Sequence, residues 1–197
     1  MNPIKYLKRQ FNRLKIDLLT QRTFLAGGIP SVDNDNIIKT VSSNYEELDI
    51  IFNRHYAIKP ADVIVDVGCG KARVFSYLLY KGYRNKMIGY EINPLVGNQT
   101  KKRLSRYNNV EIRCANIFDD FPAEGNVFYL YHPFKEAMMK TFMQRFLSIA
   151  DRNPIMLYNN TLHLDVFNPG IFEIEAFDIP VTAYGYNFTF AMIRVRK

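Results

Sequence analysis

The sequence has no tryptophan and only two cysteines among its 197 residues. Cys69 and Cys114 lack the spacing of metal ligands, so we expect both to be reduced packing residues and expect no bound metal or disulfide. No apolar run approaches the ~20 residues that cross a bilayer, and the N-terminal segment lacks the apolar core of a signal peptide. These absences predict a cytoplasmic protein without a transmembrane segment.

Acidic residues are scarce at the N-terminal end of the chain. The formal net charge is +7, and residues 1–24 alone carry +5 because Asp17 is their only acidic residue. The rest of the chain is nearly balanced, which argues against a surface that coats nucleic acid broadly and indicates one local basic element. The length and the 48% hydrophobic content are typical of one globular domain.

The basic segment also has a regular apolar pattern. A 3-4-3-4 spacing predicts an amphipathic helix with one apolar stripe, made of Ile4, Leu7, Phe11, Leu14 and Leu18. Such a helix could lie on an anionic membrane, on nucleic acid, on a partner or on its own domain. Glycine, proline and polar residues then break the pattern. We therefore divide the chain into a basic helix with a linker or flap, residues 1–36, and one domain, residues 37–197.

Residues 63–67 form an apolar, β-branched run that only Asp66 interrupts, as in a buried parallel strand. Gly68 and Gly70 follow, and they allow the backbone to turn tightly and approach a ligand at the start of the next helix. A dinucleotide fingerprint would place glycine or alanine at the sixth position, where this chain has Arg73. The turn therefore predicts a ligand site that is not of the common NAD type.

The order Asp-x-Gly-x-Gly resembles motif I of class I S-adenosylmethionine (SAM) dependent methyltransferases, with Ala72 in place of the usual third glycine. In that family the loop wraps the methionine end of the cofactor. Glu91 ends the second predicted strand, where a carboxylate can accept hydrogen bonds from ribose hydroxyls, although NAD enzymes use the same position. After the third strand, Asn116 fits the polar residue that meets the adenine amino group in this family, between apolar neighbours. The resemblance implies these cofactor-binding residues: Tyr45, Asp66, Gly68, Cys69, Gly70, Glu91, Ile92, Asn116, Ile117 and Tyr131.

A helix over 44–57 is predicted just before the first strand. Ser43 and Glu46 have capping-box spacing, and an apolar face begins at Tyr45. The family places a lid over the cofactor here, which would make Tyr45 a lid residue, but its spacing also suits a core aromatic. Because the preceding basic helix suggests surface docking, we expect removal of residues 1–24 to leave SAM binding largely intact.

The fourth predicted strand ends in Tyr131-His132-Pro133-Phe134. This run loosely resembles the Asn-Pro-Pro-Phe motif of amino-group methyltransferases, but it has one proline and lacks the asparagine or aspartate. His132 and Phe134 are the candidate catalytic residues, because an imidazole could orient or deprotonate the acceptor and the ring could flank it. The alternative is that the segment only walls the cofactor pocket.

Two alternating segments, 172–176 and 186–192, follow the last βα unit without a helix between them. The whole pattern predicts an α/β fold, with a Rossmann-like, doubly wound, mostly parallel seven-stranded sheet and a C-terminal antiparallel hairpin. The implied function is methyl transfer from SAM to a nitrogen or oxygen acceptor in a protein, a small molecule or a nucleic acid. The Asp-Val-Gly-Cys-Gly-Lys-Ala-Arg run, after a helix that carries Tyr45, resembles small bacterial methyltransferases that are loosely similar to the non-SET histone lysine methyltransferases. The alternatives are an inactive SAM-binding protein, an NAD-linked oxidoreductase and a basic-helix adaptor, the last associated with a membrane or a partner through residues 1–24.

Overall fold

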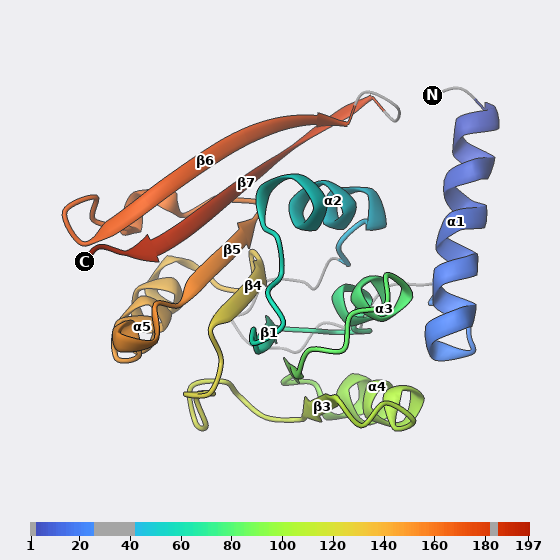
Figure 1. The fold of residues 1–197 in the computed structure, drawn as a ribbon, viewed down its shortest axis with the longest axis horizontal. Coiled ribbons are helices and arrows are strands. Elements are labelled where there is room, and N and C mark those ends of the chain that lie inside the picture. The colour runs from blue at the N-terminus through green and yellow to red at the C-terminus, as the bar shows by residue number, and fades with distance from the viewer. Residues whose placement is uncertain (1–2, 26–41, 182–184) are drawn as a thin grey trace.

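The computed structural model describes residues 3–25, 42–181 and 185–197. One sheet lies between helices on its two faces (Figure 1). Its strands are β1 (Ile64–Val67), β2 (Met87–Tyr90), β3 (Val110–Arg113), β4 (Val127–Tyr131), β5 (Ile155–Asn159), β6 (Phe172–Val181) and β7 (Tyr186–Val195). The helices are α1 (Pro3–Gln21), α2 (Tyr45–Ile50), α3 (Arg73–Tyr80), α4 (Pro94–Leu104) and α5 (Glu136–Leu147), with short helical segments η1 (Ile51–His55), η2 (Ala150–Arg152) and η3 (Leu164–Val166).

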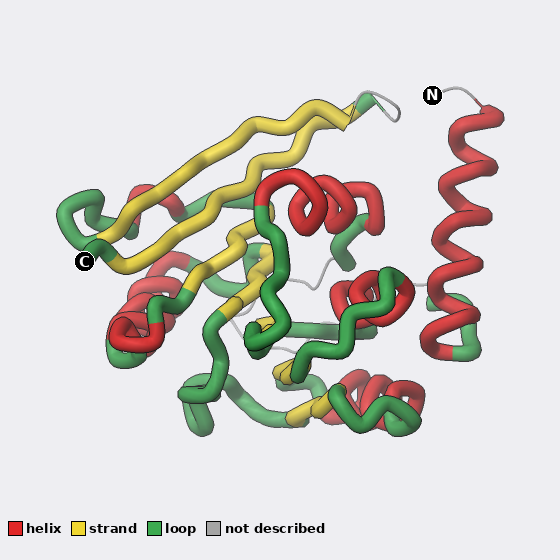
Figure 2. Tube along the Cα trace, viewed as in Figure 1, coloured by secondary structure: helices red, strands yellow, loops and turns green. Residues whose placement is uncertain are grey.

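The strand order is β3-β2-β1-β4-β5-β7-β6. Strands β1 to β5 are parallel, whereas β7 pairs antiparallel with both β5 and β6. The long β6–β7 hairpin extends beyond the parallel strands (Figure 2). The structure thus confirms the predicted seven-stranded sheet, and it places the reversal of strand order between β1 and β4, where open α/β sheets bind ligands.

The core has two layers because successive strand residues point to opposite faces. Ile64 and Tyr129 pack in the layer that contains α2 and α3 side chains. Val65 and Phe128 pack in the other layer, with α5. Both faces of β1, β2, β4 and β5 are therefore dry, whereas the edge strand β3 has an exposed Glu111.

The predicted apolar stripe of α1 does not pack on the domain. Ile4, Leu7 and Phe11 are 66–75% exposed. The helix docks through its opposite, largely polar side, where Asp17 and Gln21 are buried. Helix α1 therefore does contact its own domain, which is one of the modes that the sequence left open. It makes this contact with its polar side and not with the predicted apolar stripe.

The region before β1 differs in detail from the prediction. The helix over 44–57 is present, but it continues from α2 into the π-helical η1. The capping box is wrong, because Asn44 is the N-cap residue and the Ser43 hydroxyl hydrogen-bonds to the Tyr129 hydroxyl at 2.7 Å. The predicted linker over residues 27–36 lies outside the described residues.

Candidate functional site

The turn between β1 and α3 has three residues with left-handed backbone. Gly68, Gly70 and Ala72 have φ values of +76°, +53° and +54°. Glycine adopts this conformation freely, whereas alanine at Ala72 does so at a cost of about 1 kcal/mol. The Cys69 N–H donates to the carbonyl of Tyr90 at 2.7 Å, so the turn is attached to the end of β2. Gly68 is exposed between buried neighbours and is the point where a ligand can approach the backbone.

Glu91 joins the glycine turn to the start of α4. Its two carboxylate oxygens accept the N–H of Gly70 at 2.9 Å and the N–H of Asn93 at 2.8 Å. The Asn93 side chain in turn accepts N–H groups of α4 and caps the helix, as the sequence indicates by an asparagine directly before Pro94. Burial raises the pKa of the Glu91 carboxyl, although backbone N–H groups act in the opposite direction. The carboxylate has more lone pairs than its backbone N–H partners occupy, so a ribose hydroxyl could still bind here.

Asp66 is a second buried carboxyl group at this edge and is 4% exposed. Burial, and then the nearby Glu91 carboxylate, raise the pKa of Asp66 to about 8. Two buried carboxyl groups beside one turn favour a cationic ligand, which would allow both to ionise.

The loop after β3 brings the predicted adenine-binding residues to the same edge. The Asn116 side-chain oxygen accepts the Phe118 N–H at 3.2 Å, which fixes the orientation of its amide. Ile117 is buried and Ile92 is half-buried. Cys69 is buried in the turn as predicted, whereas Cys114 is exposed, with its Sγ atom packed against Gly97 of α4.

His132 follows β4 and lies close to two side chains from the end of β5. Its Nδ1 atom is 3.0 Å from the Tyr158 hydroxyl, and its ring centroid is 5.0 Å from that of His163. The backbone of His132 is left-handed, with φ +39°, a conformation that non-glycine residues keep mainly at functional sites. Burial, and then the charge of His163, lower the pKa of His132, so its imidazole is neutral at pH 7.

The other two residues of the β4 motif differ in their surroundings. The Phe134 ring is buried, with its centroid 5.2 Å from that of Phe118 and 5.6 Å from that of Phe142. It walls the site from the core side in this structure, and its contact with an acceptor remains a prediction. Tyr131 is half-buried, and burial followed by the charge of Glu47 raises its pKa to about 12.

A buried polar cluster beside Tyr131 was missed by the sequence analysis. Glu47, from α2, is 2% exposed and accepts hydrogen bonds from the Asn159 amide at 3.1 Å and the Tyr186 hydroxyl at 3.1 Å. The Asn159 amide also donates to the Tyr129 hydroxyl, while its side-chain oxygen has no hydrogen-bond partner among the described residues. No sequence signal identifies this cluster, because its members are brought together only by the packing of α2 on the strand ends.

A network of hydrogen bonds from α1 and α4 lies behind the glycine turn, and no pattern in the sequence had indicated it. Gln21 of α1 donates to the carbonyl of Lys71 at 2.7 Å and to the Ser76 hydroxyl at 2.8 Å. Arg103 of α4 donates to Gln21 at 2.8 Å and to Thr100, whose hydroxyl donates to the Gly70 carbonyl at 2.8 Å. Helix α1 is thus part of the wall that holds this turn.

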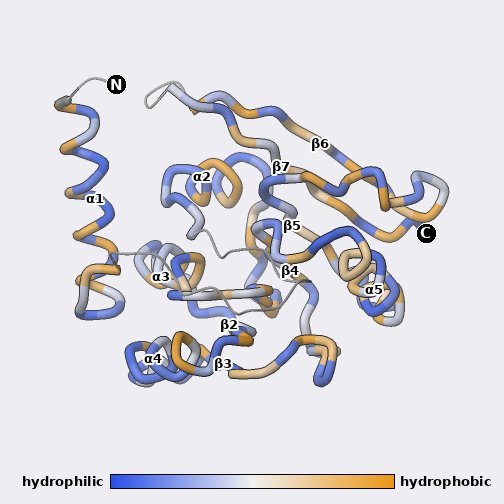
Figure 3. The backbone as a smooth tube through the Cα atoms, turned by 180° about the vertical axis from the view of Figure 1, so that it is seen from behind, coloured by the Kyte–Doolittle hydropathy of each residue, from blue (hydrophilic) through white to orange (hydrophobic). Residues whose placement is uncertain are grey.

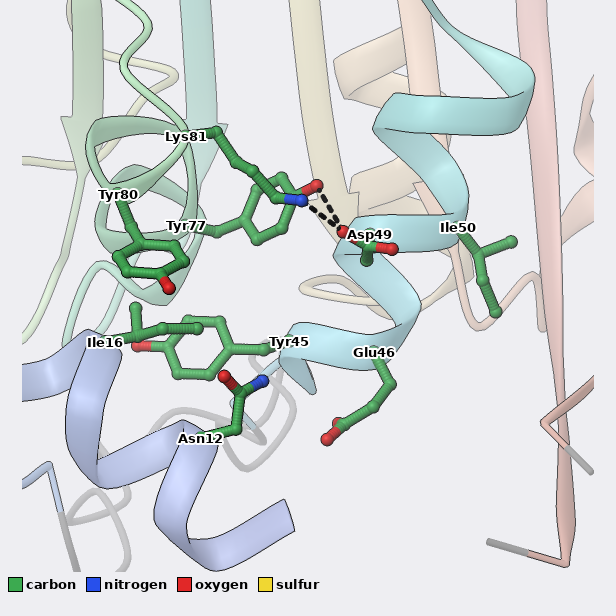
Figure 4. A pocket seen from close by; sticks show the side chains of 9 residues that line it. All are labelled: Asn12, Ile16, Tyr45, Glu46, Asp49, Ile50, Tyr77, Tyr80 and Lys81. Carbon is green, nitrogen blue, oxygen red and sulfur yellow. Dashed lines mark hydrogen bonds and ion pairs between the residues drawn. The ribbon is translucent and has the colours of Figure 1, made fainter. Parts of the chain in front are cut away.

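Tyr45 is buried and faces α1. Its hydroxyl donates to Asp17, and the Arg73 guanidinium lies over its ring at 5.7 Å. The ring lines a cavity of about 430 Å³ between α1, α2 and α3, shown in Figure 4. The glycine-turn residues do not line this cavity, so the predicted lid role of Tyr45 over the cofactor stays untested.

The sequence matches no family model. The ribosomal RNA small subunit methyltransferase A of Thermotoga neapolitana is 32% identical over 121 residues, which are 61% of this chain and 36% of the relative. Its counterpart in Thermotoga maritima is 37% identical over 70 residues, 36% of this chain and 23% of the relative. The chain thus spans only about a quarter to a third of these curated relatives.

Solved structures are similar over a larger share of the chain. An RNA methyltransferase from Salinibacter ruber in complex with S-adenosyl-L-homocysteine has a TM-score of 0.57 and 15% identity, and the match covers 80% of this chain and 95% of that one. A tRNA methyltransferase of B. subtilis has a TM-score of 0.59 and 9% identity, covering 80% and 68%. Mitomycin 7-O-methyltransferase has a TM-score of 0.58 and 15% identity, covering 77% and 54%. With the strand order and the glycine turn, these likenesses show that the chain has the fold of the class I SAM-dependent methyltransferases.

Proposed function

We propose that this chain transfers the methyl group of SAM to a nitrogen or oxygen acceptor. The observation that carries the proposal is the pair of buried carboxyl groups, Asp66 and Glu91, beside a left-handed glycine turn at the switch point between β1 and β4. SAM has a cationic sulfonium, an amino group and a ribose diol. The two cationic groups would be attracted by the carboxylates, the diol could donate hydrogen bonds to them, and the glycine turn would let the cofactor lie close to the backbone.

The predicted residues fit the cofactor in a consistent arrangement. Gly68, Cys69 and Gly70 would face its methionine end, and Glu91 its ribose. Asn116, with Ile92 and Ile117, would face the adenine. When bound, SAM supplies an activated methyl group, and the chain's contribution is to orient the two reactants in line and exclude water.

An NAD-linked oxidoreductase is the weaker alternative. Arg73, at the sixth position of the turn, is buried and donates to the Leu25 carbonyl at 3.0 Å. A bulky, tied side chain at this position does not suit the close helix packing of a dinucleotide fingerprint. Calorimetry with SAM, S-adenosylhomocysteine and NAD separates the two functions. A methyltransferase should bind SAM and S-adenosylhomocysteine but not NAD, whereas an oxidoreductase should bind NAD.

We further propose RNA as the first acceptor class to test. The curated relatives and two of the solved structures above carry names of RNA methyltransferases, whereas mitomycin 7-O-methyltransferase is named for a small molecule. The acceptor therefore varies within this fold and depends on the residues around Tyr131 and His132. Transfer of labelled methyl from SAM into RNA, protein and small-molecule pools is the decisive assay. Incorporation into protein or small molecules alone would overturn the RNA proposal and keep methyl transfer.

Replacing Glu91 with glutamine should weaken SAM binding roughly tenfold while the fold is kept. The amide retains one acceptor oxygen, but its NH2 group would face a backbone N–H and could not accept from a ribose hydroxyl. Calorimetry measures the change. Glu173→Gln, an exposed position on β6, is the matched control. Equal SAM affinity of Glu91→Gln and the wild type would contradict the ribose role.

Replacing His132 with alanine should lower kcat roughly tenfold or more with little change in SAM affinity. Because burial lowers the pKa of His132, turnover of the wild type should fall only at acidic pH, below the ordinary histidine range. A base role requires the proton on Nδ1, donated to the Tyr158 oxygen, so that Nε2 is free to accept. His55→Ala is the control, because the His55 ring packs 4.3 Å from Phe177, on the β6–β7 hairpin. If His132→Ala keeps the kcat and the pH profile of the wild type, His132 has no catalytic role and the segment only lines the pocket.

A further inference from the structure

The exposed large apolar side chains of this chain are concentrated on α1 and the residues just after it. Of the eleven found in the described residues, eight lie between residues 3 and 25. Those that form one face, here named the α1 outer face, are Ile4 (75% exposed), Leu7 (66%), Phe11 (69%), Leu14 (37%) and Leu18 (45%). A contiguous apolar surface of this kind marks an interaction site in soluble proteins.

The docked side of α1 fixes the outer face toward solvent. Ile16 and Thr20 are buried against the domain. Arg106, in the turn that follows α4, donates to the carbonyl groups of Leu19 and Thr20 at 2.6 and 3.0 Å. Together with the Gln21 contacts, these bonds hold the helix so that it cannot turn its apolar stripe inward without leaving polar groups unpaired.

Basic side chains border the outer face. Lys8 and Lys15 are exposed and lie seven residues apart, so they fall on one line along the helix beside the apolar stripe, and the exposed Arg22 follows the last residue of α1. Lys5 is exposed as well, and Asp17, the only acidic residue of this segment, is buried. The face therefore combines apolar area with positive charge.

Shape distinguishes the candidate occupants. Helix α1 lies at the outer edge of the molecule in both views, and it displays hydrophobic and hydrophilic residues in alternation (Figures 1 and 3). Nineteen residues at about 1.5 Å each form a convex ridge of about 28 Å, which suits a flat surface more than a groove.

Two other occupants fit less well. A coiled coil with a second copy needs three to four heptads, and the stripe covers about two. RNA phosphates would use the lysines and a base could stack on Phe11, but RNA has no comparable use for the exposed aliphatic side chains that make up the rest of the face.

We infer that the α1 outer face docks on an anionic lipid bilayer surface, with the apolar side chains in the interface and Lys8, Lys15 and Arg22 at the headgroup phosphates. The mode is peripheral, because no helix among the described residues has the length and apolar content to span a membrane. Long basic side chains next to an apolar stripe can extend to the headgroups from this position. The inference does not depend on the acceptor or on methyl transfer.

The test is co-sedimentation of the full chain with vesicles of phosphatidylglycerol and phosphatidylcholine, compared with phosphatidylcholine alone. We expect binding to the anionic vesicles that weakens as salt is raised. Leu7→Glu/Phe11→Glu and Lys8→Glu/Lys15→Glu should each reduce the partition coefficient roughly tenfold or more. All four side chains are exposed, so far-UV circular dichroism should be unchanged. The Lys15 ammonium lies 5.5 Å from the centroid of the Tyr80 ring, so the lysine variant should lose this contact and unfold at a slightly lower temperature.

Matched controls lie on the opposite side of the molecule. Ile171→Glu places the same charge at an exposed apolar residue, and Arg145→Glu/Arg152→Glu reverses two exposed basic residues. These variants should bind vesicles like the wild type. The proposal is overturned if the protein binds neither vesicle type or binds both equally. It is also overturned if the protein does not bind vesicles but forms a dimer that Leu7→Glu/Phe11→Glu dissociates, or if it binds RNA and only the lysine variant weakens that binding.

Discussion

Replacing Asp66 with asparagine is expected to stabilise the ligand-free protein at pH 8 while weakening SAM binding. Burial raises the pKa of Asp66 to about 8 in the folded chain, whereas the unfolded chain has an ordinary aspartate pKa near ~4. Between these values the folded state holds a proton that the unfolded state lacks, so the free energy of unfolding falls as pH rises. The stabilisation is fully present below pH ~4 and lost as pH passes through 8, a change of roughly 5 kcal/mol at most.

Asparagine imitates the neutral carboxyl group and cannot ionise. The variant should therefore lack most of this pH dependence, and its advantage over the wild type should grow from pH 5 to pH 8. Urea unfolding at several pH values measures it, with Asp178→Asn, an exposed position on β6, as control. SAM should favour the ionised carboxylate, so wild-type binding should release protons near pH 7, which calorimetry in buffers of different ionisation enthalpy detects. Identical pH dependence in variant and wild type would show that Asp66 does not titrate as proposed.

Removing residues 1–24 is expected to reduce SAM affinity and to lower the free energy of unfolding by several kcal/mol. The sequence alone predicted intact SAM binding, because a basic amphipathic helix looks like a surface appendage. In the structure the segment supplies Asp17 to the Tyr45 hydroxyl and Gln21 to the back of the glycine turn. Its loss leaves a buried phenol and the Lys71 carbonyl without these partners, at about 1–3 kcal/mol each.

A point variant separates turn support from general unfolding. Gln21→Ala should destabilise the fold by about 2–3 kcal/mol and weaken SAM binding, because three hydrogen bonds around the turn are lost. Gln10→Ala, on the same helix and half-buried, is the control. Combining Gln21→Ala with Arg103→Ala should cost less than the sum of the single effects, since the two side chains act through one bond. If Gln21→Ala and the truncated chain both bind SAM with wild-type affinity, α1 does not support the glycine turn.

Part of the candidate site could be read from the sequence. Asp66, Gly68 and Glu91 were placed correctly at one edge, because the carboxyl ends of parallel strands must meet there once the strands are recognised. The contacts of Glu47 with Asn159 and of Gln21 with Lys71 could not be predicted. They join residues 112 and 50 positions apart, and each depends on how a helix is docked.

The sequence by itself determined the alternation of strands and helices, the glycine turn, the Asn93 cap and the terminal hairpin. These depend on local backbone preference and on period-two or period-3.6 burial, which neighbouring residues encode. Only the tertiary structure decided that the Ser43 hydroxyl hydrogen-bonds to the Tyr129 hydroxyl and that α1 turns its apolar stripe outward. A hydrophobic pattern shows which face of a helix would lower the free energy most by leaving water. In this protein the docked face of α1 is instead the one that makes hydrogen bonds to buried polar groups. For α1 that is the side of Asp17 and Gln21, whose hydrogen-bond partners lie far away in the sequence.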